Sequence, residues 1–368
     1  MADYARLIDI FEKLVSFKTI SGDREASAAC LNYAEKILDT QGLHIDRYSS
    51  NGFESIVATT KVSKAPTLLL QAHLDVVPAA DDMFQLRGEG PNLVGRGAYD
   101  MKYAAACYLY LVEELGPACA GMDFGIMFTT DEEVDGRNGV QYLLDQGYSC
   151  DVCVLPDGGD NWRVESAAKG QWLVDAEATG VSAHGSRPWE GDNAALKLLQ
   201  FVQEATALAP VKRHTDTTVV VTKLQAGVAI NQVPDSGTAC FDIRFLTMPA
   251  YEAIHATLTR LAKKHHVELT DRNKIIPLEL DVNLPQVQTW VQTVETIRGD
   301  DAPDGYSLSF GATDARFFAE HGIPTIVTRP KGGGIHAEGE WIVEAEVYQF
   351  YDCLKKYTET IASPAATP

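Results

Sequence analysis

The sequence predicts an α/β protein: a mixed, mostly parallel sheet flanked by helices, with a smaller ferredoxin-like α+β domain inserted into the chain. Three observations support this prediction. Strands and helices alternate through residues 67–155, which is typical of an open α/β sheet. Near Gly170 the order changes to β-α-β-β-α-β, and after Pro277 the earlier alternation returns. We therefore expect a discontinuous larger domain over 1–170 and 278–368, and an inserted domain over 171–277.

The first part of the chain predicts two helices followed by alternating strands and helices. Apolar residues at helical spacing predict helices over 4–15 and 25–40, the second after capping residues 21–23. The uninterrupted apolar run of 67–72 predicts a strand that is buried on both faces. The elements expected next are a helix over 102–115, a strand over 124–130, a helix over 138–146 and a strand over 152–155.

The inserted domain and the returning α/β segment are predicted from the same periodicities. In the inserted domain we expect, in order, strand 172–179, helix 193–208, strands 217–224 and 238–245, helix 250–264 and strand 267–271. After Pro277 we expect helices over 284–298 and 314–321, a strand over 325–328 and a last helix over 344–361.

Composition limits the partners and the compartment. Lys and Arg number 31 against 51 Asp and Glu, a net charge of −20 that argues against nucleic acid or an anionic membrane as partner. The longest apolar runs are far shorter than a membrane span, and the first residues lack the pattern of a secretory signal. Seven cysteines, an odd count at low density, suit a reducing compartment. We therefore expect a cytoplasmic protein.

Side chains that can bind metals follow four of the predicted strands. Ligands of open α/β sheets bind beyond the carboxyl ends of the strands, so these side chains are expected to meet there. They are His73 and Asp75 after 67–72, Glu132 and Glu133 after 124–130, Asp157 after 152–155, and His336 after 325–328 and a glycine loop. Asp100 directly precedes the helix predicted over 102–115.

Each of these residues alone has a simpler explanation. His73 would be a core histidine beside a surface acid, Asp100 a helix N-cap, and Glu132 with Glu133 part of a solvated charge run. Asp157 and His336 would be ordinary turn and loop residues. Together, two histidines and three carboxylates suffice for two divalent cations, one carboxylate bridging, and the lack of a thiolate favours a hydrolytic zinc site.

Cys150 and Cys153 have the spacing of a C-x-x-C motif, which in principle allows redox or metal chemistry. On a buried strand, however, the two side chains point to opposite faces. Core packing is therefore the favoured explanation, and a C-x-x-C oxidoreductase is the weaker alternative.

Five segments, in this order and spacing, resemble the zinc exopeptidase and deacylase family that includes acetylornithine deacetylase, succinyl-diaminopimelate desuccinylase and glutamate carboxypeptidase. They are QAHLDVVP (71–78), GRGAYDMK (95–102), TTDEEV (129–134), SAHG (182–185) and IH (335–336). The resemblance runs through nearly the whole chain. It implies that His73 and Asp157 hold one zinc, that Glu133 and His336 hold the other, and that Asp100 bridges them. It further implies that Glu132 is the general base and that Asp75 orients His73.

The resemblance also assigns roles to the inserted domain, which in this family forms a lid and commonly a dimer. His184 would reach a neighbouring active site and stabilise the oxyanion, the alternative being a capping or loop histidine. Arg244 would bind a substrate carboxylate, or else form a salt bridge on the strand surface. Further substrate-binding candidates are Asn231 and, in the loop 309–314, Gly311 and Thr313.

The residues and the resemblance together predict a co-catalytic dinuclear metallohydrolase that cleaves an amide bond of a small peptide by metal-activated water. Two zinc ions are expected, with cobalt or manganese as alternatives, in a homodimer formed through the inserted domain. The peptidase is expected to be of the aminopeptidase, dipeptidase or carboxypeptidase type. Asp157 stands where the carboxypeptidase and deacylase branches usually have glutamate, whereas aspartate is more typical of the aminopeptidase and dipeptidase branches. The alternatives are an N-acyl amino acid deacylase and a catalytically silent metal-binding relative, against which the extra carboxylate of Glu132 argues.

Overall fold

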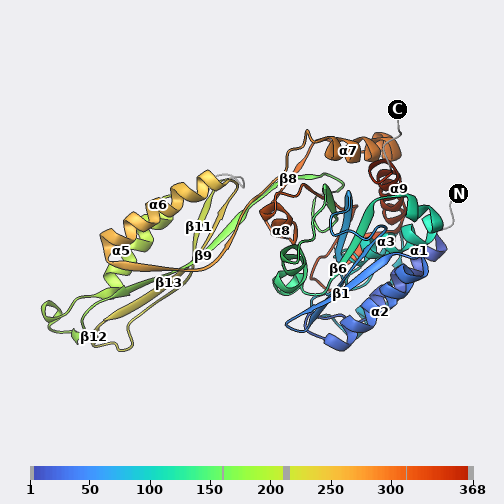
Figure 1. Cartoon of the computed structure of the whole chain (residues 1–368). Helices are drawn as coiled ribbons and strands as arrows, with labels where there is room; N and C mark the ends of the chain where they lie inside the picture. The colour runs from blue at the N-terminus through green and yellow to red at the C-terminus, as the bar shows by residue number, and fades with distance from the viewer. Residues whose placement is uncertain (1–3, 160, 210–215, 312, 364–368) are drawn as a thin grey trace. The chain divides into compact units, whose positions relative to one another are not determined.

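The computed structural model describes residues 4–159, 161–209, 216–311 and 313–363, which divide into two compact units (Figure 1). Unit 1 contains the described residues within 1–166, 280–309 and 313–368, and unit 2 those within 167–279 and 310–312. Each unit has its own cluster of buried apolar side chains. Among the described residues, no helix combines the length and the hydrophobicity that crossing a membrane requires.

The core of unit 1 is a six-stranded sheet in the order β1-β2-β6-β3-β7-β17. Four strands run parallel to one another: β6 (Phe124–Thr129), β3 (Leu68–His73), β7 (Val152–Leu155) and β17 (Thr325–Val327). Every residue of these four strands is buried, as expected for a sheet that is covered on both faces. The mostly parallel sheet that the sequence predicts is therefore present.

An antiparallel hairpin, which the sequence analysis did not predict, extends this sheet at one edge. It consists of β1 (His44–Ser50) and β2 (Phe53–Thr59), and β2 pairs with β6. Asn51 and Gly52 join the two strands with φ values of 51° and 87°. Positive φ at both positions is what a two-residue type I′ turn requires, and Asn-Gly is its preferred sequence. The signal was therefore present in the chain.

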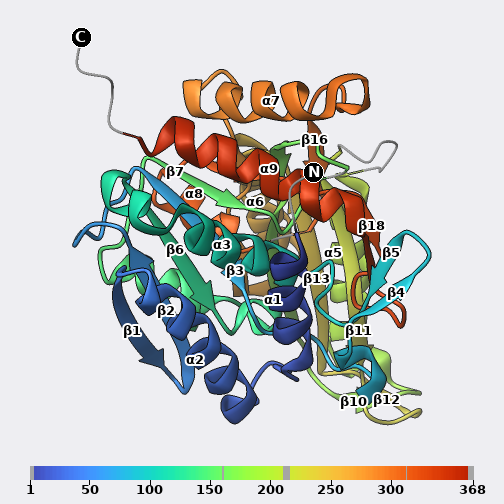
Figure 2. The ribbon, with the colours of Figure 1, turned by 90° about the vertical axis from the view of Figure 1, so that its right-hand side faces the viewer.

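Helices cover the sheet of unit 1. Figure 2 shows α1 (Ala5–Ser16), α2 (Arg24–Thr40), α3 (Lys102–Leu115) and α9 (Glu344–Ile361) side by side, with α3 packed against α1, α2 and α9. Because α3 is surrounded in this way, most of its residues on all sides are buried. Outside it, α7 (Pro285–Arg298) packs on α9. These elements match the predicted helices within a few residues.

Two predicted helices of unit 1 are shorter or less regular than expected. The helix expected over 138–146 is a π-helical turn, Arg137–Gln141, followed by the short α4 (Tyr142–Asp145). The turn is shaped by Asp131, whose carboxylate accepts a hydrogen bond from the Asn138 N–H at 2.7 Å. A Cβ at Gly139 would lie 2.2 Å from that carboxylate, so only glycine allows this approach. The helix expected over 314–321 is α8 (Ala315–Glu320).

A small second sheet in unit 1 joins segments that are far apart in the sequence. Its order is β18 (Gly332–Gly333), β19 (Trp341–Val343), β5 (Asn92–Val94) and β4 (Arg87–Glu89). Through the β19–β5 pairing, Trp341 lies opposite Val94. The loop that ends at Asp100 therefore starts beside the segment that follows His336. The sequence analysis predicted none of these four strands.

Unit 2 is a four-stranded antiparallel sheet in the order β11-β13-β9-β14, with two helices. In chain order the elements are β9 (Gly170–Thr179), α5 (Ala194–Ala207), β11 (Thr218–Ala226), β13 (Ser236–Phe245), α6 (Met248–His265) and β14 (Val267–Ile275). Buried and more exposed residues alternate along β9 and β13, so one face of the sheet packs on the helices. The predicted β-α-β-β-α-β order is therefore present, and β11 is an edge strand.

The remaining strands are short. The two-stranded pair β10 (Ala183–His184) and β12 (Gln232–Val233) belongs to unit 2. The strands β8 (Glu165–Ala168), β15 (Leu278–Glu279) and β16 (Ser307–Ser309) lie where the chain passes from one unit to the other in sequence.

Candidate functional site

The predicted metal ligands and the predicted general base, Glu132, meet in unit 1 at the carboxyl ends of the parallel strands. They form two groups, in each of which one ligand atom per residue lies within 4.8 Å of the others. The first group is His73, Glu132 and Asp157, and the second is Asp100, Glu133 and His336. His73 ends β3, Glu132 and Glu133 follow β6, and Asp157 follows β7. Parallel strands thus bring together residues that are up to 263 positions apart, from 73 to 336.

Asp100 presents one carboxylate oxygen to each group. Its Oδ1 lies 3.1 Å from His73 Nε2, and its Oδ2 lies 3.3 Å from His336 Nε2. His336 Nε2 also lies 2.9 Å from Glu133 Oε2. Two ligands bound tetrahedrally at 2.0–2.1 Å are separated by about 3.3 Å, so these ion-pair distances also match the separation of ligands that share an ion.

Asp75 contacts His73 and the backbone of Glu132 and Glu133. The resemblance implies that Asp75 orients His73, and two of its atoms lie near the imidazole: its main-chain carbonyl is 3.0 Å from His73 Nδ1, and its carboxylate is 3.5 Å from the same nitrogen. A carbonyl only accepts, so His73 Nδ1 donates to it, and Nε2 is the ring nitrogen that faces Asp100. The Asp75 carboxylate also accepts the backbone N–H groups of Glu132 and Glu133, each at 3.2 Å.

The electrostatics of the site are those of crowded, buried acids. Burial raises the pKa of Glu132 and of Asp157 well above the usual range, and raises that of Glu133 to about 7. Burial also disfavours the charged form of Asp100, but hydrogen bonds from His336 and His73 outweigh it and lower its pKa. His73 is buried as well, yet its contacts with Asp100 and Asp75 raise its pKa well above the usual value.

This donor set fits two divalent cations. The donors are imidazole nitrogens and carboxylate oxygens, the mixed set of hydrolytic zinc sites. Buried carboxylates that repel one another are stable when cations neutralise them, and within the described part of the chain the side chains that form ion pairs with these acids are His73 and His336. Cys150 and Cys153 take no part: both thiols are free and buried, and burial raises the pKa of each.

The sequence analysis missed two residues of unit 1 that surround the ligands. Glu340 is completely buried and binds the loop that carries Asp100. Arg329 follows β17 and stacks over the ring of Tyr99, 4.7 Å from its centroid. Burial raises the pKa of Asp157, and the positive charge of Arg329 opposes this rise only in small part. Arg329 directly follows a predicted strand, which is the signal that singled out the ligands, whereas no local signal distinguishes Glu340.

The candidates of the inserted domain lie in unit 2. His184 is exposed on β10, with Nδ1 2.7 Å from Ser186 Oγ. Asn231 is also exposed. It lies near His184 because its carbonyl accepts the N–H of Gly185, the next residue, at 2.7 Å. Arg244 on β13 forms a two-pronged ion pair with Asp242, at 2.7 and 3.1 Å, which is the strand-surface salt bridge given as its alternative.

The loop predicted to line the substrate pocket divides between the units. Gly311 belongs to unit 2 and Thr313 to unit 1, and Ala312 lies outside the described residues. Asp314, the last residue of the loop, is buried in unit 1 near the ligands, where burial raises its pKa well above the usual range. The roles of Gly311 and Thr313 stay predictions.

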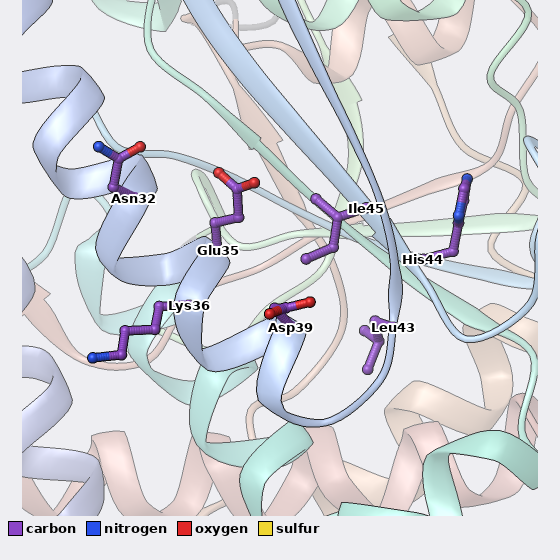
Figure 3. Close-up of a pocket in the computed structure, with 7 residues that line it drawn as sticks. All are labelled: Asn32, Glu35, Lys36, Asp39, Leu43, His44 and Ile45. Carbon is purple, nitrogen blue, oxygen red and sulfur yellow. The ribbon is translucent and has the colours of Figure 1, made fainter.

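A surface pocket elsewhere in unit 1 shares no residue with this site. It lies between α2 and the segment that leads into β1 (Figure 3). Its lining residues are Asn32, Glu35, Lys36, Asp39, Leu43, His44 and Ile45. Two of its polar groups are already engaged, since Arg47 donates to Asn32 Oδ1 at 2.6 Å and to Glu35 Oε2 at 2.7 Å.

This chain is similar in sequence and in fold to known proteins. It is 25% identical over 366 residues to the succinyl-diaminopimelate desuccinylase of a Nitratiruptor species, a match that covers 95% of this chain and 98% of the relative. Its fold is similar to that of a tripeptidase from Staphylococcus aureus (TM-score 0.80, 18% identity, 98% of this chain and 99% of that one). It is also similar to Bacillus subtilis YXEP, described as a dinuclear metal-binding peptidase of the M20 family (TM-score 0.69, 15% identity, 97% and 98%).

The sequence profile of peptidase family M20/M25/M40 matches residues 69–360, which include every ligand of both groups. The resemblance predicted from the five segments is thereby confirmed. Since the match extends over most of the chain and the fold is shared, this chain belongs to peptidase family M20/M25/M40 and is a metallohydrolase of that family.

Proposed function

We propose that this protein is a co-catalytic dinuclear metallohydrolase that cleaves an amide bond of a small peptide. The observation that carries the proposal is the placement of Asp100, with one carboxylate oxygen facing His73 and the other facing His336. A single carboxylate between two histidines is the arrangement that two neighbouring cations require. The proposed metal is zinc, with cobalt or manganese as alternatives that satisfy the same N/O donors.

The residues that would hold the metals follow from the two groups. His73 and Asp157 would hold one ion, Glu133 and His336 the other, and Asp100 would bridge them. When bound, such ions lower the pKa of water from 15.7 toward about 7 and stabilise negative charge on a carbonyl oxygen. Asp75 supports both groups, because its backbone carbonyl binds His73 and its carboxylate binds the Glu132 and Glu133 amides.

Glu132 is proposed to move the proton. Its carboxylate is buried among the ligands, and burial raises its pKa, so that it can accept a proton from water and donate it to the leaving amine. A general acid–base of this kind contributes roughly 10²–10⁴-fold to the rate. The geometry also groups Glu132 with His73 and Asp157, so that a ligand role is the alternative that experiment must separate.

A homodimer formed through the inserted domain is proposed from the free edge of the unit 2 sheet. Strand β11 lies at one edge of that sheet, and an edge strand pairs readily with another chain. It carries Leu224, exposed at 50% on the sheet face that α5 covers, and the neighbouring α5 carries Leu196 and Leu199 at 57% and 43%. Large exposed apolar side chains gathered on an edge strand and a helix indicate a contact surface. In this dimer His184 would reach the partner's site and stabilise the oxyanion.

The proposed substrate is a short peptide, and the proposed compartment is the cytoplasm. Aspartate at position 157 favours the peptide, because aspartate there is more typical of the aminopeptidase and dipeptidase branches than of the deacylase branch. An N-acyl amino acid is the second candidate, because the chain is similar over its length to a succinyl-diaminopimelate desuccinylase. For either substrate, Arg244 would bind the carboxylate through N–H donors beyond the Nε and Nη2 groups that bind Asp242. Seven free cysteines support a reducing compartment.

The proposed activity is tested by measuring hydrolysis of a panel of dipeptides, tripeptides, N-acetyl amino acids and N-succinyl amino acids. We expect hydrolysis of at least one peptide, its loss on treatment with a chelator, and its return when Zn²⁺ or Co²⁺ is added back. Hydrolysis of the N-acyl compounds alone would favour the deacylase. A metal-loaded protein that is folded and inactive on the whole panel would favour the catalytically silent relative.

Replacing Glu132 separates its two candidate roles. In Glu132→Ala we expect turnover to fall by roughly 10²–10⁴-fold or more, because the proton carrier is lost, while the metal content is unchanged. Turnover is measured on the substrate found above, and metal content by elemental analysis. Glu133→Ala is the matched comparison, since it removes a predicted ligand and should lower the metal content. Loss of metal from Glu132→Ala would make Glu132 a ligand instead.

The role of His184 across a dimer is tested by mixing two inactive variants, Glu132→Ala and His184→Ala. If His184 serves the partner's site, subunit exchange produces dimers with one complete site, and activity should return. Mixing Glu132→Ala with Glu133→Ala is the control. Both residues lie in unit 1, so each site of a mixed dimer still carries one of the two substitutions and activity should not return.

The proposed dimer surface is tested by sedimentation velocity of Leu224→Lys, which should sediment as a monomer. An unchanged dimer, or no return of activity, would contradict the proposal.

A further inference from the structure

Glu340 is a buried carboxylate whose two oxygens bind the loop that ends at Asp100. Its Oε1 accepts the backbone N–H groups of Tyr99 at 2.7 Å and of Asp100 itself at 2.9 Å. Its Oε2 accepts the N–H of Gly97 at 3.1 Å and the Nη1 of Arg96 at 2.6 Å. No part of the residue is exposed, so these four donors replace the water that an ionised carboxylate would otherwise need.

Arg96 extends this contact to the loop that carries His336. While its Nη1 binds Glu340, its Nη2 donates to the carbonyl of Ala337 at 3.2 Å. Ala337 directly follows His336 in the chain. Arg96 is itself 2% exposed, and its own backbone N–H binds the Met83 carbonyl at 2.7 Å. One carboxylate–guanidinium pair therefore contacts both loops at the residue of the ligand or next to it.

The backbone around the pair leaves little room for either loop to shift. The N–H of Gly95 donates to the Glu340 carbonyl at 3.0 Å, and the β19–β5 pairing continues from there. A Cβ at Gly332 would lie 2.3 Å from the ring of Tyr99, so the glycine run before His336 packs directly on the loop of Asp100. The 3.3 Å between His336 Nε2 and Asp100 Oδ2 is thus set by contacts behind the two side chains.

We infer that the Glu340–Arg96 pair is a positioning device that holds Asp100 and His336 at the spacing needed to bind a metal ion between them. The inference rests on the proposed metal centre and adds residues that do not contact the metal. A ligand carboxylate is effective when its backbone is held by a second layer of hydrogen bonds, and loss of such partners typically costs about 10–100-fold in metal affinity. The effect should fall chiefly on the ion shared by Asp100, Glu133 and His336.

The experiment titrates the metal-free full-length protein with Co²⁺ and follows binding by calorimetry and by the visible absorption of the bound ion. Wild-type protein should bind two ions. In Glu340→Gln the side-chain NH₂ group would face N–H donors that now bind a carboxylate oxygen, so some of these hydrogen bonds would be lost. The affinity for one of the two ions should then fall by about 10–100-fold, while the affinity for the other changes less. Arg96→Lys keeps the charge opposite Glu340 but cannot also reach the Ala337 carbonyl, so a smaller loss at the same ion is expected.

A second, part-buried ion pair of unit 1 provides the matched control. Arg298 binds Glu346 on α9 at 3.0 Å, and neither residue is among the metal ligands. Arg298 is the residue to change, because Glu346 also accepts the Lys331 N–H in the loop that leads to His336. Arg298→Lys should lower thermal stability and leave both Co²⁺ affinities unchanged. If Glu340→Gln does not fold, Arg96→Lys carries the test. Two ions bound with wild-type affinity by the folded variants, or an equal loss in Arg298→Lys, would overturn the positioning role. A wild-type protein that binds fewer than two ions would overturn the metal centre itself.

Discussion

The structure of this protein depends on the neutralisation of negative charge at one edge of a parallel sheet. Four strands end at the same edge, and the chain places acidic side chains beyond three of them. Such acids repel one another when buried, and the raised pKa of Glu133, to about 7, reflects this crowding together with the burial that causes most of it. Cations are what make the arrangement stable in the ionised form. The acids, two histidines and their supporting loops are therefore best understood as one metal-binding assembly.

Two buried carboxylates hold the backbone of the loops that carry ligands. Asp75 fixes the amides of Glu132 and Glu133, and Glu340 fixes the amides of Tyr99 and Asp100. In both places a buried carboxylate binds main-chain N–H groups of a loop and so determines where the next side chain can lie. Loops gain in this way the rigidity that strands have from their ladders, which suits a site that must present several ligands at once.

The sequence allowed the strand-end ligands to be predicted, including their meeting across the chain, but not the contacts that hold them. His73 and Asp157 directly follow strongly apolar strands, so strand ends located them, and Asn51-Gly52 could have revealed the hairpin of β1 and β2. The helix expected after residue 138 failed because its first turn is shaped by Asp131, seven residues earlier. Nothing in the local pattern joins Glu340 to Asp100, 240 positions away, since that contact exists only once β19 pairs with β5. The carboxylate of Asp75 likewise turned out to bind amides that no spacing rule could assign to it.

Asp100 is proposed to bridge the two metal ions. The decisive measurement is the metal content of the purified protein, compared with that of Asp100→Ala. With the metals added in excess and the unbound ions removed, the account predicts two divalent ions per chain in the protein and the loss of at least one from the variant, whose fold should persist. A protein that retains a single ion, or a variant that keeps both, would contradict it.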